Sequence, residues 1–340
     1  MQFQFLGTSS GVPTRTRSHS ALALQAPRRR DWLLLDCGEG TQHRLLASDF
    51  SPATLAAILI THRHGDHCLG LPGLLAHASM NGRREALTIV APTEVRRLVE
   101  SALTLTDSTL SFELDFVDVG TLAAPLQIAG LTVSAVALSH RVPSFAFAVT
   151  ESDPPRRLDR AGLATAGIAP GRAWGRLQRG EDVTLADGRC LPASRFAPAA
   201  PSRRVVVGGD NDTPELLADV CRDAQVLIHE ATYTREVAER VGSAPMHSCA
   251  ARVARFAAGV ALPHLILTHF SPRYRDRGKG PLIADIGREA AAHYQGRLYL
   301  ARDLDRYQLD EGGRLTATPF EPARVSARAA AADGGGGIDP

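Results

Sequence analysis

Four apolar runs, far apart in the chain, each lead into a side chain of the kind that binds metal ions. LAAILIT (55–61) is followed by HRHGDH, and the other three runs end at His140, Asp210 and His269. Runs this short and this apolar are typical of buried β-strands. In open α/β sheets, functional side chains gather at the carboxyl ends of strands. A lone histidine after a strand is usually a packing residue, but four such endings favour a fold that brings them together.

The HRHGDH segment offers four candidate ligands within six positions. His62 and His64 alternate at a strand exit, so both imidazoles can converge on one ion, and Gly65 permits the tight turn that follows. Asp66 and His67 then open the next helix and point elsewhere, which suits a second ion nearby. Because a single zinc site needs only three protein ligands and a water, the segment indicates two ions.

The spacing divides the candidates between the two ions. The assignment that it favours is a first set, a second set and one bridging carboxylate: His62, His64 and His140; Asp66, His67 and His269; and Asp210. Nitrogen and oxygen ligands without a thiolate suit Zn²⁺, with Mn²⁺ or Fe as open alternatives. Two ions ~3.5–4 Å apart can clamp the attacking and leaving oxygens of a phosphoryl transfer.

The rest of the chain mixes apolar runs with amphipathic stretches, which predicts an α/β sandwich. The runs that indicate strands are 3–7, 32–38, 55–62, 86–92, 131–140, 145–151, 203–210, 225–231 and 264–270. The stretches that indicate helices are 72–80, 92–103, 213–224 and 248–260. We interpret residues 1–322 as one catalytic domain.

Two segments depart from this alternation. Residues 152–200 are rich in glycine, proline and arginine and lack sustained periodicity, which indicates an insertion that projects from the core. Residues 323–340 are of low complexity, and we expect them to be disordered.

Composition narrows the class of protein. No apolar run approaches the ~20 residues of a membrane span, and the amino-terminal segment does not resemble a signal peptide. The five cysteines are scattered and form no C-x-x-C pair, so we interpret them as reduced thiols of a cytoplasmic protein. A net charge of +2 does not by itself indicate binding to nucleic acid.

The ligand pattern is also similar to that of a known family. THRHGDH matches the H-x-H-x-D-H signature of the metallo-β-lactamase superfamily, and segments through about residue 310 resemble ribonuclease Z in its order. These segments are FLGTSSGVPTRTRS, LLLDCGEGTQ, HGDHCLGLPGLL, LSHRVPSFAFAV, LIHEAT, MHS and LTHFSPRY. The resemblance implies a four-layer αβ/βα sandwich, two zinc ions per chain and endonucleolytic removal of the 3′ trailer of precursor tRNA. The products would be a tRNA 3′-hydroxyl and a trailer 5′-phosphate.

The resemblance also implies roles for individual residues. Asp66 would be both a metal ligand and the general base, and Glu230 with His247 would act on the transition state and leaving oxygen. We interpret His229, beside Glu230, as a structural histidine that faces the core. In the family the insertion is an RNA-binding arm that serves the partner subunit's active site, which implies a homodimer. The candidates for contact with the tRNA backbone are Arg172, Arg176 and Arg179.

Other functions share parts of this pattern. A different phosphodiesterase or an arylsulfatase-like hydrolase of the same superfamily would keep the ligands but generally lack the arm. An RNA-binding protein without turnover would not need the full ligand set. A di-iron redox centre prefers glutamate at position 64, where this chain has histidine, and the insertion disfavours a thiol-ester hydrolase.

Overall fold

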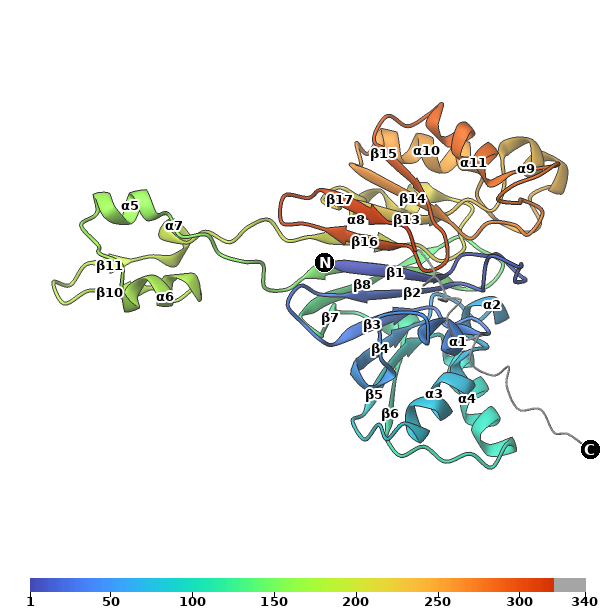
Figure 1. Cartoon of the computed structure of the whole chain (residues 1–340), viewed down its shortest axis with the longest axis horizontal. Helices are drawn as coiled ribbons and strands as arrows, with labels where there is room; N and C mark the ends of the chain where they lie inside the picture. Colours follow the sequence, from blue (N-terminus) through green and yellow to red (C-terminus); the bar gives the residue numbers. More distant parts are fainter. Residues whose placement is uncertain (321–340) are drawn as a thin grey trace, which may run out of the picture.

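The computed structural model describes residues 1–320, which form two mixed β-sheets packed face to face (Figure 1). The first sheet has the strand order β17-β16-β1-β2-β3-β4-β5-β6. In chain order its strands are β1 (Gln2–Gly7), β2 (Ala21–Gln25), β3 (Trp32–Leu35), β4 (Leu55–Leu59), β5 (Leu87–Ala91), β6 (Leu114–Asp118), β16 (Arg306–Leu309) and β17 (Leu315–Thr318).

The second sheet has the order β15-β14-β13-β12-β9-β8-β7. Its strands are β7 (Leu126–Ile128), β8 (Leu131–Leu138), β9 (Ser144–Glu151), β12 (Arg204–Val207), β13 (Val226–Glu230), β14 (His264–Thr268) and β15 (Arg297–Leu300). Strands β12 to β15 run parallel to one another, and β9 runs antiparallel to β12.

Helices cover the outer face of each sheet, so the layers are helix, sheet, sheet and helix (Figure 1). The first sheet carries α1 (Thr41–Leu45), α2 (Gly65–Cys68), α3 (Leu71–Met80) and α4 (Thr93–Leu105). The second carries α8 (Ala218–Cys221), α9 (Arg235–Val241), α10 (Ala250–Gly259) and α11 (Ile283–Ala291). Of the helices within residues 1–320, none is long and apolar enough to cross a membrane. The four-layer αβ/βα sandwich expected from the sequence is therefore confirmed.

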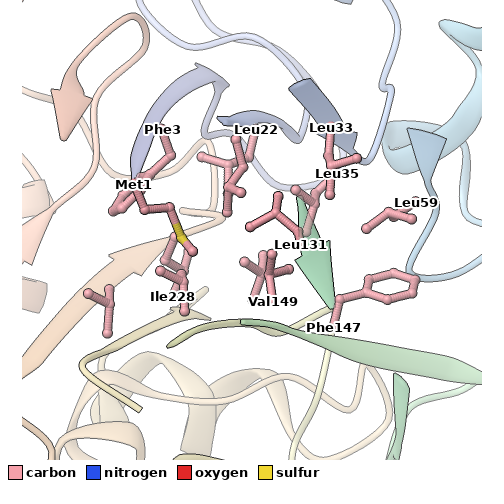
Figure 2. Packing of buried hydrophobic residues seen from close by; sticks show 14 of the residues in the cluster. Met1, Phe3, Leu22, Leu33, Leu35, Leu59, Leu131, Phe147, Val149 and Ile228 are labelled. Carbon is pink, nitrogen blue, oxygen red and sulfur yellow. The ribbon is translucent and has the colours of Figure 1, made fainter. Parts of the chain in front are cut away.

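The central core fills the space between the two sheets (Figure 2). Phe3 and Leu33 of the first sheet face Val149 and Ile228 of the second, and each of these side chains is at most 1% exposed. Two further apolar clusters lie between each sheet and its helices. Each Å² of apolar surface that is buried stabilises the fold by ~25 cal/mol. The three clusters therefore hold the strand ends in fixed positions.

Strand direction separates the sandwich into two ends. In the second sheet, Val207 at the end of β12 pairs with Phe147 near the start of β9, and Arg204 pairs with Thr150. The segment that carries Asp210 therefore leaves one end of the sheet, and residues 152–203 leave the other. This arrangement places the predicted metal ligands and the insertion at opposite ends of the molecule (Figure 1).

The insertion is a small folded unit on a two-chain stalk (Figure 1). It contains α5 (Arg160–Thr165), α6 (Arg172–Gln178), β10 (Val183–Thr184), β11 (Cys190–Leu191) and α7 (Ala193–Phe196). These elements surround their own apolar cluster, in which Leu163 and Leu177 are fully buried. The irregular sequence pattern did not predict these elements. Each helix has only one or two turns, each strand has two residues, and the cluster spans the whole insertion.

A buried ion pair joins the two ends of the stalk where it meets the sheet. Arg203 donates two hydrogen bonds to the carboxylate of Glu151, at 2.6 and 2.8 Å, and a third to the carbonyl oxygen of Leu309. Both charged side chains are less than 10% exposed. The pair therefore ties both strands of the stalk to the hairpin of β16 and β17.

Replacing Arg203 with methionine is expected to lower the free energy of unfolding by ~3–5 kcal/mol, because the Glu151 carboxylate would be left buried and unpaired. Urea unfolding measures the change. Arg157→Met is the matched control, since its exposed pair with Glu311 is expected to contribute less than ~1 kcal/mol. Equal losses of stability in the two variants would contradict a special role for the buried pair.

Candidate metal centre

The ends of β4, β12 and β14 meet the loop after β8 at one end of the sandwich. All the residues predicted as metal ligands lie there, with ligand atoms of each set within 4.8 Å of one another. The described residues form three overlapping groups that could hold a metal: His62, His64, His140 and Asp210; Asp66, His67 and His269; and Asp210, His247 and His269.

The first set is nearly tetrahedral in its spacing. His64 Nδ1 lies 3.0 Å from His62 Nε2 and 3.2 Å from His140 Nε2. The Oδ2 atom of Asp210 lies 3.5 Å from His62 Nε2 and 3.7 Å from His140 Nε2. Ligands ~2.0–2.1 Å from a tetrahedral ion are separated by about 3.3 Å. The donor atoms present therefore fit a divalent ion at their centre.

The second set has the same spacing. His269 Nε2 lies 3.2 Å from His67 Nε2 and 3.3 Å from Asp66 Oδ2. The Oδ1 atom of Asp210 lies 3.4 Å from His67 Nε2 and 3.3 Å from His269 Nε2. Each oxygen of Asp210 thus faces a different set of ligand atoms.

Local backbone geometry directs these side chains inward. His64 is extended just before α2 begins at Gly65, which separates its ring from the side chains of Asp66 and His67. His269 has a positive φ of 56°, a strained conformation for a residue with a side chain. Contacts with buried neighbours offset the cost of that conformation. One of them is the Thr232 hydroxyl, which lies 3.1 Å from His269 Nδ1.

Neighbouring polar groups fix the imidazole nitrogens that face away from the centre. Nδ1 of His67 lies 2.7 Å from the carboxylate of Asp36, and Nδ1 of His140 lies 3.0 Å from the carbonyl oxygen of Met246. Asp36 also accepts hydrogen bonds from the amide and hydroxyl groups of Thr61. Partners of this kind set the tautomer and orientation of a metal-binding histidine.

Charge and burial shift the pKa values of the histidines at the centre in opposite directions. Burial and the neighbouring His67 lower the pKa of His62 well below its usual value. Burial also lowers the pKa of His67, but the carboxylates of Asp36, Asp210 and Asp66 outweigh it and raise the pKa to about 10. A cation at the centre would relieve this excess of negative charge.

Glu230 and His247 form a second polar pair beside the centre. His247 Nδ1 lies 2.9 Å from Glu230 Oε1, and Glu230 also accepts hydrogen bonds from Asn211 N and Thr232 Oγ1. Burial lowers the pKa of His247, but the Glu230 carboxylate dominates and raises it to about 9. The pair therefore favours the protonated form of His247. His229 is fully buried and contacts Asn211 and the Glu230 carbonyl oxygen, in agreement with a structural role.

The three arginines predicted to contact tRNA lie in the insertion and far from the centre. Arg172 begins α6, and Arg176 lies in its last turn. Arg176 and Arg179 both pair with Glu181, at 2.9 and 2.8 Å. Glu181 therefore neutralises part of the charge that the sequence assigns to RNA contact.

Three supporting residues of the centre were not identified from the sequence: Asp36, Asn211 and Thr232. Asp36 follows the apolar run WLLL as Asp210 follows VVVGG, so the strand-end criterion that found Asp210 applies to it equally. Asn211 follows Asp210, and Thr232 lies two residues after Glu230. Only the fold shows that Asn211 contacts Glu230 and that Thr232 contacts His269.

The sandwich, with histidine and carboxylate groups gathered where its strands end, is that of a metallo-β-lactamase-fold protein with a divalent-metal site. Among solved structures, human tRNase Z short form matches with a TM-score of 0.62 at 24% identity, covering 91% of this chain and 100% of that one. A metallo-β-lactamase-fold protein from Bacillus subtilis matches with a TM-score of 0.63 at 16% identity, covering 90% and 97%. The family model described as anti-Pycsar protein Apyc1 matches residues 1–152.

Curated relatives specify the family within this fold. The ribonuclease Z of Marinobacter nauticus is 50% identical over 317 residues, which cover 93% of this chain and 98% of that protein. The ribonuclease Z of Pseudomonas putida is 49% identical over 320 residues, covering 94% and 100%. This chain belongs to the ribonuclease Z family.

Asp36→Asn is expected to weaken metal binding by about 10–100-fold, because the amide orients His67 less firmly and carries no charge. Competition with a chromophoric chelator measures the affinity. Asp31→Asn, at an exposed position, is the matched control. Unchanged affinity in Asp36→Asn would show that Asp36 does not support the centre.

Proposed function

We propose that this protein is a zinc-dependent endoribonuclease that removes the 3′ trailer from precursor tRNA and leaves a tRNA 3′-hydroxyl. Ribonuclease Z relatives with about half of their residues identical over nearly the full length support this function. The observation that carries it is the position of Asp210, whose two oxygens face two different sets of ligand atoms. A carboxylate placed between two sets of ligands suits a pair of ions that act together on one phosphodiester.

Two zinc ions per chain fit the donor atoms best. The first set would be His62, His64, His140 and one oxygen of Asp210, and the second would be Asp66, His67, His269 and its other oxygen. When bound, the ions supply Lewis acidity toward the phosphate and its attacking water. Nitrogen and oxygen donors also accept Mn²⁺ or Fe.

Asp66 and His247 would accept and donate the protons of the proposed reaction. Asp66 keeps one carboxylate oxygen 2.7 Å from the amide of Gly11, and nearby His67 and His269 outweigh its burial and hold its pKa well below the usual range. The carboxylate is therefore ionised, and its place beside the proposed ions would let it accept a proton from the attacking water. His247, protonated and oriented by Glu230, would donate a proton to the departing 3′-oxygen of the tRNA.

The direct test is cleavage of a precursor tRNA with a short 3′ trailer. Wild-type protein should yield a tRNA 3′-hydroxyl and a trailer 5′-phosphate, and Asp66→Ala should lose cleavage by at least ~10³-fold while binding tRNA with similar affinity. Gel analysis of end-labelled RNA and filter binding measure the two properties. Hydrolysis of bis(p-nitrophenyl) phosphate without precursor tRNA cleavage would instead favour another phosphodiesterase or an arylsulfatase-like hydrolase.

We propose that the insertion is a tRNA-binding arm and that the protein is a homodimer. The arm leaves the sheet at the end opposite the metal centre (Figure 1). An arm that steadies a tRNA at a metal centre therefore reaches the centre of a second copy more readily than its own. Arg172 begins α6 and has no ion pair within residues 1–320, whereas Arg176 and Arg179 share Glu181. Arg172 is thus the strongest of the three candidates for a phosphate contact.

We propose that the reaction takes place in the cytoplasm. All the cysteines of the chain, each within residues 1–320, are free thiols, as expected of a reducing compartment.

Mixing two inactive variants tests arm and dimer together. One variant replaces residues 156–199 with a short glycine-serine turn, and the other is Asp66→Ala. Each alone should fail to cleave precursor tRNA, but a refolded mixture should recover about one quarter to one half of the wild-type activity, because a mixed dimer joins an intact centre to the partner's arm. A mixture as inactive as its components would contradict action across the dimer. Hydrolysis of bis(p-nitrophenyl) phosphate by the armless variant is the control for an intact centre.

A further inference from the structure

A cavity of about 900 Å³, lined by none of the candidate metal ligands, is not used by the chemistry above. It is bordered by the loops 14–17, 272–277 and 302–305 and by Pro319 and Phe320. Its volume lies in the upper part of the ~300–1,000 Å³ range of ligand pockets. We call it the arginine pocket, because five arginines and three aspartates contribute to its wall.

Two aspartates of the arginine pocket already have several partners. Asp276 accepts hydrogen bonds from Arg17 Nη2 at 2.9 Å and Thr16 Oγ1 at 2.7 Å. Asp303 accepts hydrogen bonds from Thr8 Oγ1 and the amide of Ser18, both at 2.7 Å. These carboxylates are therefore engaged in holding the loops together.

Most of the arginines are free. Arg17 forms the buried floor, bound to Asp276 and to the carbonyl oxygen of Ala301. Arg15, Arg275, Arg277 and Arg302 are exposed, and within residues 1–320 none of their guanidinium groups forms an ion pair or hydrogen bond. Five arginines against three aspartates leave the wall of the pocket with an excess of positive charge, although Arg302 lies near Asp276 and Asp305. Such a cleft attracts a polyanion, and the planar guanidinium suits phosphate in particular.

The pocket is joined to the side of the centre that holds the general base. The loop of Thr14 also carries Gly11, whose amide bonds to Asp66. The guanidinium carbon of Arg17 lies 4.9 Å from the ring centroid of Phe270, directly after His269. The lining residues, all within 1–320, include none from the segments of Glu230 and His247.

The direction of the proposed reaction then identifies the occupant. His247 donates its proton to the 3′-oxygen of the tRNA, the P–O3′ bond breaks, and water's oxygen joins the phosphate, which stays on the trailer. The trailer therefore continues from the phosphate away from the tRNA. We propose that the arginine pocket binds the backbone phosphates of the trailer that follow the scissile phosphate. This inference rests on the proposed function and names a further part of the same substrate.

The test uses three precursor tRNAs that share one body and carry trailers of one, three or six nucleotides. Wild-type kcat/KM should be about tenfold higher for the longer trailers, because only they place further phosphates against the free guanidinium groups. In Arg275→Ala/Arg277→Ala, and separately in Arg302→Ala, this ratio between trailers should fall toward one. In the double variant, the log–log salt dependence for the six-nucleotide trailer should weaken by about 0.7 for each phosphate that the protein no longer neutralises.

Arg297→Ala is the matched control, since this exposed arginine starts β15 at the opposite end of the sheet and has no ion pair within residues 1–320. It should keep the wild-type ratio. Equal losses for all trailers would show that the arginines contact the tRNA body and would overturn the inference, as would a wild-type ratio of one. Cleavage of none of the three RNAs by the wild type would refute the proposed function itself. Thermal unfolding of each variant establishes that it is folded.

Discussion

The shared carboxylate of Asp210 is the constraint on which the arrangement of this molecule depends. Its two oxygens face different sets of histidines, and these arrive from separate segments of the chain. A buried carboxylate in an apolar sandwich is costly unless positive charge or hydrogen-bond donors compensate it. Nitrogen donors or a cation must therefore surround the carboxylate, so the strand ends must lie within a few ångströms of one another. The paired sheets meet this requirement because their three apolar clusters fix every strand end.

The sandwich assigns separate tasks to its two ends. One end carries the ligands, Glu230, His247 and the arginine pocket, and the other carries the arm and its buried root of Glu151 and Arg203. If the arm and the metal centre that act on one RNA belong to different copies, a long RNA such as tRNA can bind at both. Under the proposed dimer, recognition and chemistry on one tRNA would then belong to different copies of the chain.

Much of the centre could be predicted from the sequence because metal ligands follow apolar runs. His62, Asp210 and His269 each end such a run, and the structure brings them together. The supporting contacts could not be predicted, because Asp36 and Thr232 meet the centre only through tertiary packing. Strands β2, β6, β7 and the last three strands were not assigned from the sequence. Segments such as ALALQ and RYQL are short, and their place in a sheet depends on the strands that they join. The arm shows a different limit, because its short helices rest on a cluster assembled from residues as distant as Leu163 and Phe196. The predicted disordered tail, 323–340, lies outside the residues that the structure describes.

Whether Asp210 joins two ions in one centre can be measured directly. The experiment is a crystal structure of the purified holoprotein, with anomalous diffraction recorded on both sides of the zinc absorption edge. Two peaks per chain are expected, ~3.5–4 Å apart, with one next to each oxygen of Asp210. A single peak bound by one set of histidines, with the other set empty at full zinc saturation, would contradict a shared carboxylate.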